Sequence, residues 1–130
     1  MKAYVLGLAD GFRGTALLEA LQALGFEAEM VAGLDGRLLT ADEVRNLWDP
    51  DIAKITVGRG LAGAEIACAL GHQRMYERVV AGSDRWALLF EDDVTIDAGV
   101  LDVLPDLEAL PAQSIVTLRH GEAGALVCNP

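Results

Sequence analysis

The feature that most constrains this chain is a short apolar run, Trp86 to Phe90, followed at once by three carboxylates, Glu91, Asp92 and Asp93. An apolar run without polar alternation is typical of a strand buried on both faces. The acids would then stand at the carboxyl end of that strand, where open α/β sheets bind ligands. In extended backbone residues 91 and 93 project to the same side. We therefore predict a site for a hard divalent cation, Mn²⁺ or Mg²⁺, held by Glu91 and Asp93; a solvated acidic turn is the alternative.

The rest of the chain alternates short apolar runs with segments of helical periodicity, which predicts an α/β layered sheet with flanking helices. We expect strands over residues 3–8, 26–31, 52–57, 86–90, 114–118 and 123–128, and helices over 15–24, 40–48, 62–80 and 100–110, the last broken by Pro105. The helix at 40 should begin with a capping box of Thr40 and Glu43. The length predicts a single domain over residues 1–130. Asn129-Pro130 is typical of the start of another helix, so the chain is either naturally short or truncated at its C-terminus.

Charge and hydropathy exclude several classes of protein. Twenty acidic and ten basic side chains give a net charge of -10, which disfavours binding to nucleic acid or anionic lipid. An anionic ligand would therefore need a cation to hold it. No run approaches the ~18 apolar residues of a membrane span, and the N-terminal run is too short for a signal peptide. Cys68 and Cys128 lack zinc-type spacing and are predicted to be buried thiols, so we expect a reduced, cytoplasmic protein.

A glycine-rich segment offers a second kind of site. Residues 58–63, GRGLAG, fit G-x-G-x-x-G between a predicted strand and a predicted helix, which is the context of a dinucleotide fingerprint. A dinucleotide-binding domain is therefore one alternative. The simpler interpretation is a flexible connector.

Other polar side chains fall at positions that could face a ligand. Glu65, Cys68 and His72 share one helical face and could form a metal or acid–base group, although polar residues so placed more often tie a helix to a neighbouring loop. Asp10 and Arg13 follow the first strand, where an arginine can meet a phosphate.

Two stretches resemble glycosyltransferase family 25, the lipopolysaccharide-biosynthesis and procollagen-galactosyltransferase family. Residues 61–72, LAGAEIACALGH, are similar to the family's L-x-x-GEIGCALSH helix, and residues 86–94, WALLFEDDV, to its ALILEDDV strand. Residues 31–39, VAGLDGRLL, resemble its DAVDGR-L turn. The family's Arg-rich segment after the first strand is reduced here to Arg13.

The resemblance implies a GT-A-like (Rossmann-like) fold, a UDP-hexose donor carrying galactose or glucose, and inverting transfer to a saccharide acceptor such as lipopolysaccharide. On this basis Asp10, Arg13, Asp35 and Asp92 are the candidate donor-binding residues. The catalytic base is not identified, and His120 and Glu122 are weak candidates. A non-catalytic relative that keeps the nucleotide crevice is the main alternative, and a homo-oligomer that covers a sheet edge stays open.

Overall fold

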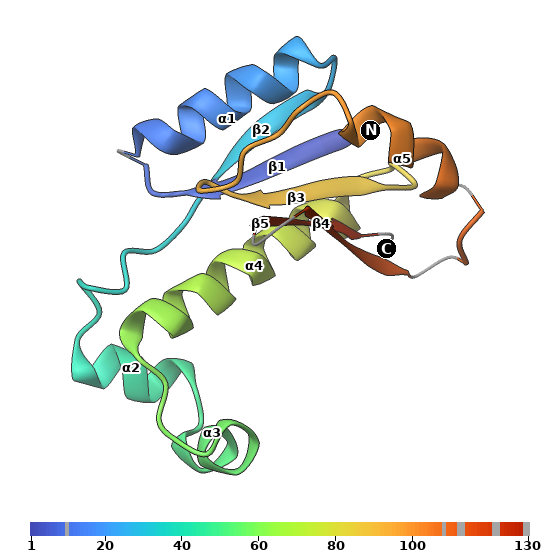
Figure 1. The fold of residues 1–130 in the computed structure, drawn as a ribbon. Helices are drawn as coiled ribbons and strands as arrows, with labels where there is room; N and C mark the ends of the chain where they lie inside the picture. Colours follow the sequence, from blue (N-terminus) through green and yellow to red (C-terminus); the bar gives the residue numbers. More distant parts are fainter. Residues whose placement is uncertain (10, 108, 112–113, 121–122, 129–130) are drawn as a thin grey trace.

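A sheet with the strand order β2-β1-β3-β5-β4 organises the part of the chain that the computed structural model describes (Figure 1). That part comprises residues 1–9, 11–107, 109–111, 114–120 and 123–128, with the backbone alone for 119–120 and 123–128. The strands are β1 (Lys2–Gly7), β2 (Glu27–Ala32), β3 (Ala87–Glu91), β4 (Ile115–His120) and β5 (Ala123–Cys128). The helices are α1 (Phe12–Ala23), α2 (Ala41–Leu47), α3 (Pro50–Val57), α4 (Gly63–Ala81) and α5 (Val100–Leu107).

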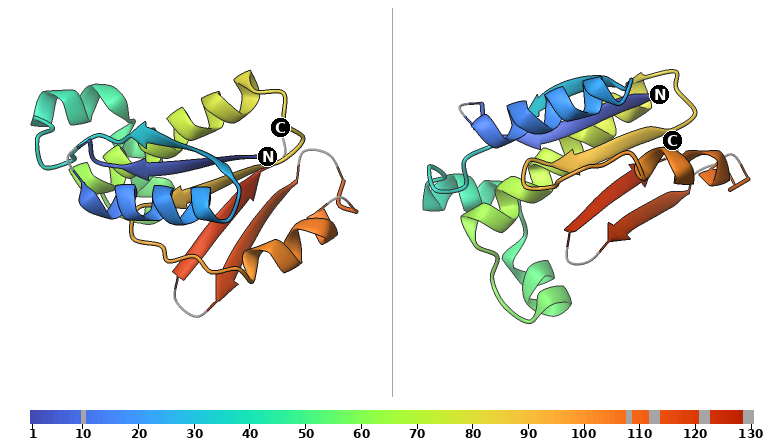
Figure 2. Two further views of the ribbon diagram at one scale, coloured as in Figure 1. Left: turned by 90° about the horizontal axis from the view of Figure 1, so that it is seen from above. Right: turned by 45° about the horizontal axis from the view of Figure 1, so that its top comes forward.

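The topology creates a switch point between β1 and β3. β1 pairs in parallel with β2 on one side and with β3 on the other, whereas β5 is antiparallel to both β3 and β4. The chain therefore leaves β1 in one direction through α1 and returns on its other side through α4. These two helices cover opposite faces of the parallel strands (Figures 1 and 2). Loops at the carboxyl ends of β1 and β3 diverge at such a point, and this is where open α/β sheets bind ligands.

The two central strands are buried on both faces, as the apolar runs predict. One apolar cluster joins alternate positions of β1 and β3 to α1 and α5, and includes Val5, Leu88, Phe90, Leu17, Leu21 and Leu107. The other cluster joins the intervening positions to β2 and α4, and consists of Tyr4, Leu6, Val31, Met75, Val79, Ala87 and Leu89. Glu91 is the first exposed residue after the buried positions of β3. The α/β prediction and the predicted burial of this strand are confirmed.

The expected strand over residues 52–57 is wrong, because this segment belongs to helix α3. The Asp49 carboxylate accepts a hydrogen bond from the Asp51 N–H at 2.9 Å, and Pro50 occupies the first turn. Gly58 then ends the helix in the left-handed conformation, with φ 78°. These are strong start and stop signals, and they outweigh a short alternation of apolar and polar residues. In a second correction, α5 continues through Pro105 to Leu107, where a break was expected.

Because residues 52–57 are helical, the glycine-rich segment that follows them is not preceded by a strand. Residues 58–63 connect two helices, not a strand and a helix. The strand–loop–helix arrangement that a dinucleotide fingerprint requires is therefore absent here, and the segment connects α3 to α4.

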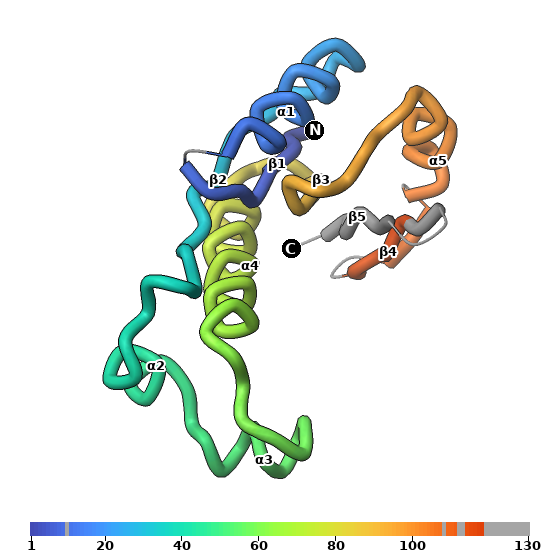
Figure 3. Tube along the Cα trace, turned by 60° about the vertical axis from the view of Figure 1, so that its left-hand side comes forward, coloured from blue at the N-terminus to red at the C-terminus, as the bar shows by residue number. Residues whose placement is uncertain are grey.

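The capping box at the start of α2 is confirmed. Thr40 Oγ1 accepts from the Glu43 N–H at 3.2 Å, and Glu43 Oε2 accepts from the Thr40 N–H at 2.8 Å. Both α2 and α3 lie beyond the sheet, near the N-terminal end of α4 (Figure 3). Among the described residues, no helix is both long and apolar enough to cross a membrane.

The loop that follows β2 is held directly against the first turn of α4. A Cβ placed on Gly36 would lie 2.5 Å from the Cα of Ala64, and one placed on Gly63 would lie 2.5 Å from the Gly36 carbonyl oxygen. Both contacts are with backbone, which cannot rotate away. Glycine at 36 and 63 therefore permits an approach that fixes the position of Asp35 and Arg37 beside α4.

We expect Gly36→Ala to lower the free energy of unfolding by about 1–3 kcal/mol, because the loop must move away from α4. Gly60→Ala is the matched control, since a Cβ there would meet only the Trp48 ring, at 4.0 Å. Its effect should stay within about 0.5 kcal/mol. Urea unfolding of both variants measures the difference, and equal stabilities would contradict the close approach.

Candidate functional site

A pocket of about 290 Å³ opens at the carboxyl ends of the three parallel strands. This volume is at the lower end of the range usual for small-molecule sites. The loops after β1 and β2, the first turns of α4 and the end of β3 form its wall, with the lining residues Leu6, Gly7, Leu8, Arg13, Gly33, Leu34, Asp35, Gly36, Arg37, Ala64, Ala67, Cys68, Glu91 and Asp92. The pocket thus occupies the topological switch point that the strand order creates.

Charged side chains of both signs line this pocket. Arg13 Nη2 lies 3.3 Å from Asp92 Oδ1. The Arg37 guanidinium donates two short hydrogen bonds to the Asp35 carboxylate, from Nε to Oδ1 at 2.8 Å and from Nη2 to Oδ2 at 2.7 Å. These hydrogen bonds from Arg37 lower the pKa of the Asp35 carboxyl to about 2. With Glu91, the lining holds three carboxylates and two guanidinium groups, so its formal charge is -1.

The backbone turns directly after Glu91, which gives the three acids different directions. Asp92 folds over the end of β1, where a Cβ on Gly7 would lie 3.2 Å from the Asp92 Cβ. Glu91 and Asp92 line the pocket, whereas Asp93 is not among the lining residues. The extended backbone assumed for Glu91 and Asp93 is therefore replaced by a turn. Their role as a pair of metal ligands stays a prediction.

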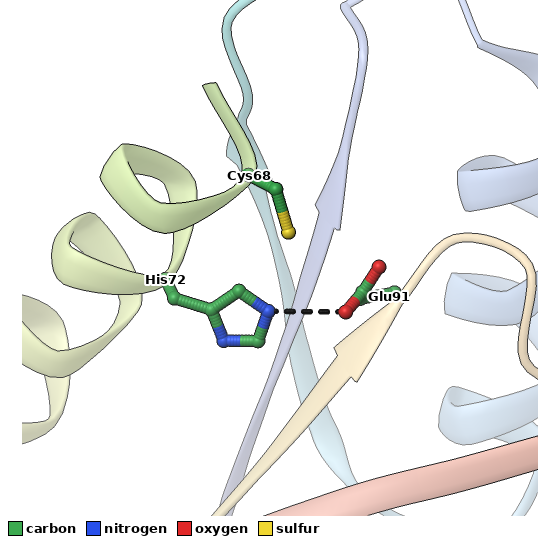
Figure 4. Close-up of side chains that lie close together, drawn as sticks. All are labelled: Cys68, His72 and Glu91. Atoms are coloured by element: carbon green, nitrogen blue, oxygen red, sulfur yellow. Dashed lines mark hydrogen bonds and ion pairs between the residues drawn. The ribbon is translucent and has the colours of Figure 1, made fainter. Parts of the chain in front are cut away.

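A thiol, an imidazole and a carboxylate meet at the edge of the pocket (Figure 4). His72 Nε2 lies 3.1 Å from Glu91 Oε1, within hydrogen-bonding distance. The Cys68 sulfur, one ring nitrogen of His72 and one carboxylate oxygen of Glu91 all lie within 4.8 Å of one another. Partial burial raises the pKa of the Cys68 thiol, and the negative charges of Glu91 and Asp93 raise it further.

The prediction that Cys68 is a buried thiol is wrong, because the residue is exposed and its thiol, which forms no disulfide, is only partly covered. α4 packs on the sheet through Met75 and Val79, and Cys68 lies instead where the helix passes the pocket. The side chain of Cys128 lies outside the described residues.

Glu65 ties the start of α4 to the adjacent loop, which is the structural role that the sequence analysis gave as the more frequent one. Its carboxylate accepts from Arg59 Nη1 and Nη2 at 2.8 and 2.7 Å, and from the Ala62 N–H at 2.8 Å. The Arg59 hydrogen bonds, followed by that of Ala62, lower the pKa of Glu65 to about 2. Glu65 therefore anchors the start of α4, whereas Cys68 and His72 reach the end of β3.

Of the candidate donor-binding residues, the structure places Arg13, Asp35 and Asp92 together in the lining. Asp10 and Glu122 lie outside the described residues, as does the side chain of His120. The sequence reasoning missed Arg37, although its spacing of two from Asp35 in a turn was a usable signal. It also missed the contact of Cys68 and His72 with Glu91, for which only their shared helical face was visible.

The Glu65 contacts predict a pH-dependent stability. Because the pKa of Glu65 is lowered from 4.5 to about 2 on folding, its contribution is complete above about pH 4.5 and is lost as the pH falls towards 2. We expect Glu65→Gln to melt at a lower temperature than the parent at pH 7, and the gap to close at the acidic end. Glu19→Gln, on the exposed side of α1, controls for the loss of one negative charge. A gap that is constant with pH would contradict the assignment.

Comparisons with known proteins agree with the arrangement of these motifs. The family model for glycosyltransferase family 25 (LPS biosynthesis protein) matches residues 1–125. The human protein named inactive glycosyltransferase 25 family member 3 is 32% identical over 104 residues, which cover 75% of this chain and 18% of that protein. A glycosyltransferase 25 family member of Aedes aegypti is 28% identical over 88 residues, covering 65% of this chain and 14% of that protein. The matched segments therefore span less than a fifth of these relatives.

Proposed function

This chain belongs to glycosyltransferase family 25, and from that premise we propose that its pocket binds the diphosphate of a UDP-hexose donor through a divalent cation, Mn²⁺ or Mg²⁺. The hexose, galactose or glucose, would be transferred to a saccharide acceptor such as lipopolysaccharide. The single observation that carries the proposal is the charged lining at the carboxyl ends of β1 and β3.

The charge of the pocket explains why a cation is needed. A nucleoside diphosphate would approach a lining of formal charge -1 on a chain of net charge -10. The negative charge of the lining and that of the whole chain both repel the diphosphate when no cation is bound. The oxygen atoms of Glu91 and Asp92 fit a hard cation, which prefers carboxylate ligands. When bound, the cation would neutralise the diphosphate as the bond to the sugar breaks.

The two arginines of the pocket, Arg13 and Arg37, would contribute to donor binding in different ways. Arg13 is 60% exposed, and its 3.3 Å contact with Asp92 is longer than a strong charged hydrogen bond. Its guanidinium is therefore able to leave Asp92 and bind a phosphate oxygen. Arg37 is oriented by the hydrogen bonds of its guanidinium group to Asp35 and presents a second positive charge to the lining. A general base for the acceptor hydroxyl is not assigned, and His120 and Glu122 stay predictions.

A non-catalytic donor-binding domain is the second candidate function. The observation that favours it is the name of the human relative, which describes that protein as inactive. Such a domain would use the same pocket and the same cation but would not transfer the sugar.

Calorimetry with UDP tests the proposed donor site. We expect binding to be at least tenfold tighter with Mn²⁺ than in EDTA, because the cation converts repulsion on both sides into attraction. Glu91→Gln should weaken the Mn²⁺-dependent part, and Glu19→Gln should bind as the parent does. Asp93→Asn and Asp92→Asn, measured side by side, decide between the ligand predicted from the sequence and the one that lines the pocket. UDP binding that is equal with and without metal would refute the proposal.

Release of UDP from UDP-galactose or UDP-glucose separates the two candidate functions. A glycosyltransferase should release UDP in the presence of Mn²⁺, and Glu91→Gln should reduce the rate at least tenfold. Metal-dependent UDP binding without any release, with saccharide acceptors present, would instead support the non-catalytic domain.

A further inference from the structure

The cluster of Cys68, His72 and Glu91 has a composition unlike that of an Mn²⁺ or Mg²⁺ site. It offers one sulfur, one imidazole nitrogen and one carboxylate oxygen, all within 4.8 Å of one another. Hard cations prefer oxygen ligands alone, whereas thiolate and imidazole are ligands of Zn²⁺ and similar metals. The cluster is therefore chemically distinct from the oxygen-only set assigned to the donor site, although the two sets share Glu91.

Two elements of the fold bring the three donors together. Cys68 and His72 are four residues apart on α4, which places both on the same side of the helix. Glu91 ends β3 and faces them across the gap between the sheet and the helix (Figure 4). The hydrogen bond between His72 and Glu91 fixes the two side chains with their donor atoms already adjacent.

The distances are close to those of a tetrahedral zinc centre. With bonds of about 2.1 Å to nitrogen and oxygen, the two atoms would be about 3.4 Å apart, and the sulfur would lie about 3.6 Å from each. His72 Nε2 and Glu91 Oε1 are 3.1 Å apart, and no pair in the cluster exceeds 4.8 Å. Small side-chain rotations would therefore complete the three contacts.

We propose that Cys68, His72 and Glu91 bind a thiophilic divalent cation, with Zn²⁺ as the expected ion. Binding forms three bonds from the cation to the sulfur, nitrogen and oxygen, and it releases the thiol proton of Cys68 to solvent. The proton that His72 Nε2 donates to the Glu91 carboxylate moves to Nδ1 of the neutral imidazole, so that Nε2 and the carboxylate oxygen exchange their hydrogen bond for bonds to the metal and only the thiol proton is released. Three protein ligands leave a fourth position open to water or to a small ligand.

One consequence rests on the proposed function, although the zinc site itself does not. Glu91 belongs to both ligand sets, and a carboxylate that binds Zn²⁺ is less available to Mn²⁺. Zinc would therefore compete with the metal-dependent binding of UDP.

Titration of metal alone into the metal-free chain tests the zinc site without any nucleotide. Calorimetry should detect one Zn²⁺ per chain, bound at least 100-fold more tightly than Mn²⁺, as expected for a set of sulfur and nitrogen ligands. Cys68→Ser and His72→Ala should each weaken Zn²⁺ binding at least tenfold. Cys128→Ser is the matched thiol control, since Cys128 pairs with Ala87 at the opposite end of β3 from Glu91. It should bind Zn²⁺ as the parent does.

Cobalt supplies a second readout that does not depend on affinity. Co²⁺ bound at this site should give a sulfur-to-cobalt charge-transfer absorption that is lost in Cys68→Ser and retained in Cys128→Ser. Absence of this band in the parent, or Zn²⁺ affinity unchanged by Cys68→Ser, would overturn the proposal. Asp92→Asn and Asp93→Asn should both keep Zn²⁺ binding, whereas one of them should lose Mn²⁺-dependent UDP binding, so failure of the zinc site and failure of the donor site give different results.

Discussion

Burial of β1 and β3 on both faces is the constraint on which the rest of this structure depends. With α1 on one face and α4 on the other, a charge placed within either strand would lose its water without gaining a partner, at a cost of several kcal/mol. Polar chemistry is therefore confined to the strand ends, and Glu91 is the first residue of β3 that reaches solvent. Because the strand order also reverses at β1, the loops diverge there and leave a pocket. The same double burial that stabilises the core thus determines where a ligand can bind.

Much of the fold was predictable because double burial is visible in local sequence. The run from Trp86 to Phe90 predicted β3, and the strand is where expected, with Glu91 and Asp92 at its carboxyl end in the lining of the pocket. Residues 52–57 were not predicted correctly, since six residues are too few for an alternating pattern to separate a strand from a helix. The deciding signals, the Asp49 cap and the Gly58 terminator, lie outside the segment itself. For a segment this short, the residues at its boundaries are a stronger signal of helix than the periodicity within it.

The candidate site was less predictable, because its geometry depends on contacts between distant segments. Which of the acids faces the pocket is decided by a turn after Glu91, and the sequence pattern alone favoured continued extension. The spacing of Cys68 and His72 was visible, but their partner depends on how α4 crosses the end of β3. Such a crossing is a tertiary property with no local signature. Conversely, the local pair of Asp35 and Arg37 could have been inferred from spacing in a turn.

Glu91 belongs to both of the ligand sets proposed above, and this affects which metal the pocket would favour. With Asp92 it offers only oxygen, which suits Mn²⁺ or Mg²⁺, and with Cys68 and His72 it offers a mixed set, which suits Zn²⁺. His72 Nε2 lies 3.1 Å from Glu91 Oε1, and this hydrogen bond orients the carboxylate towards α4. Binding of a metal to either set would replace that hydrogen bond, but in the mixed set the nitrogen and oxygen atoms already lie side by side. If both proposals hold, Glu91 can serve only one set at a time, so the metal in greater supply should determine which set forms.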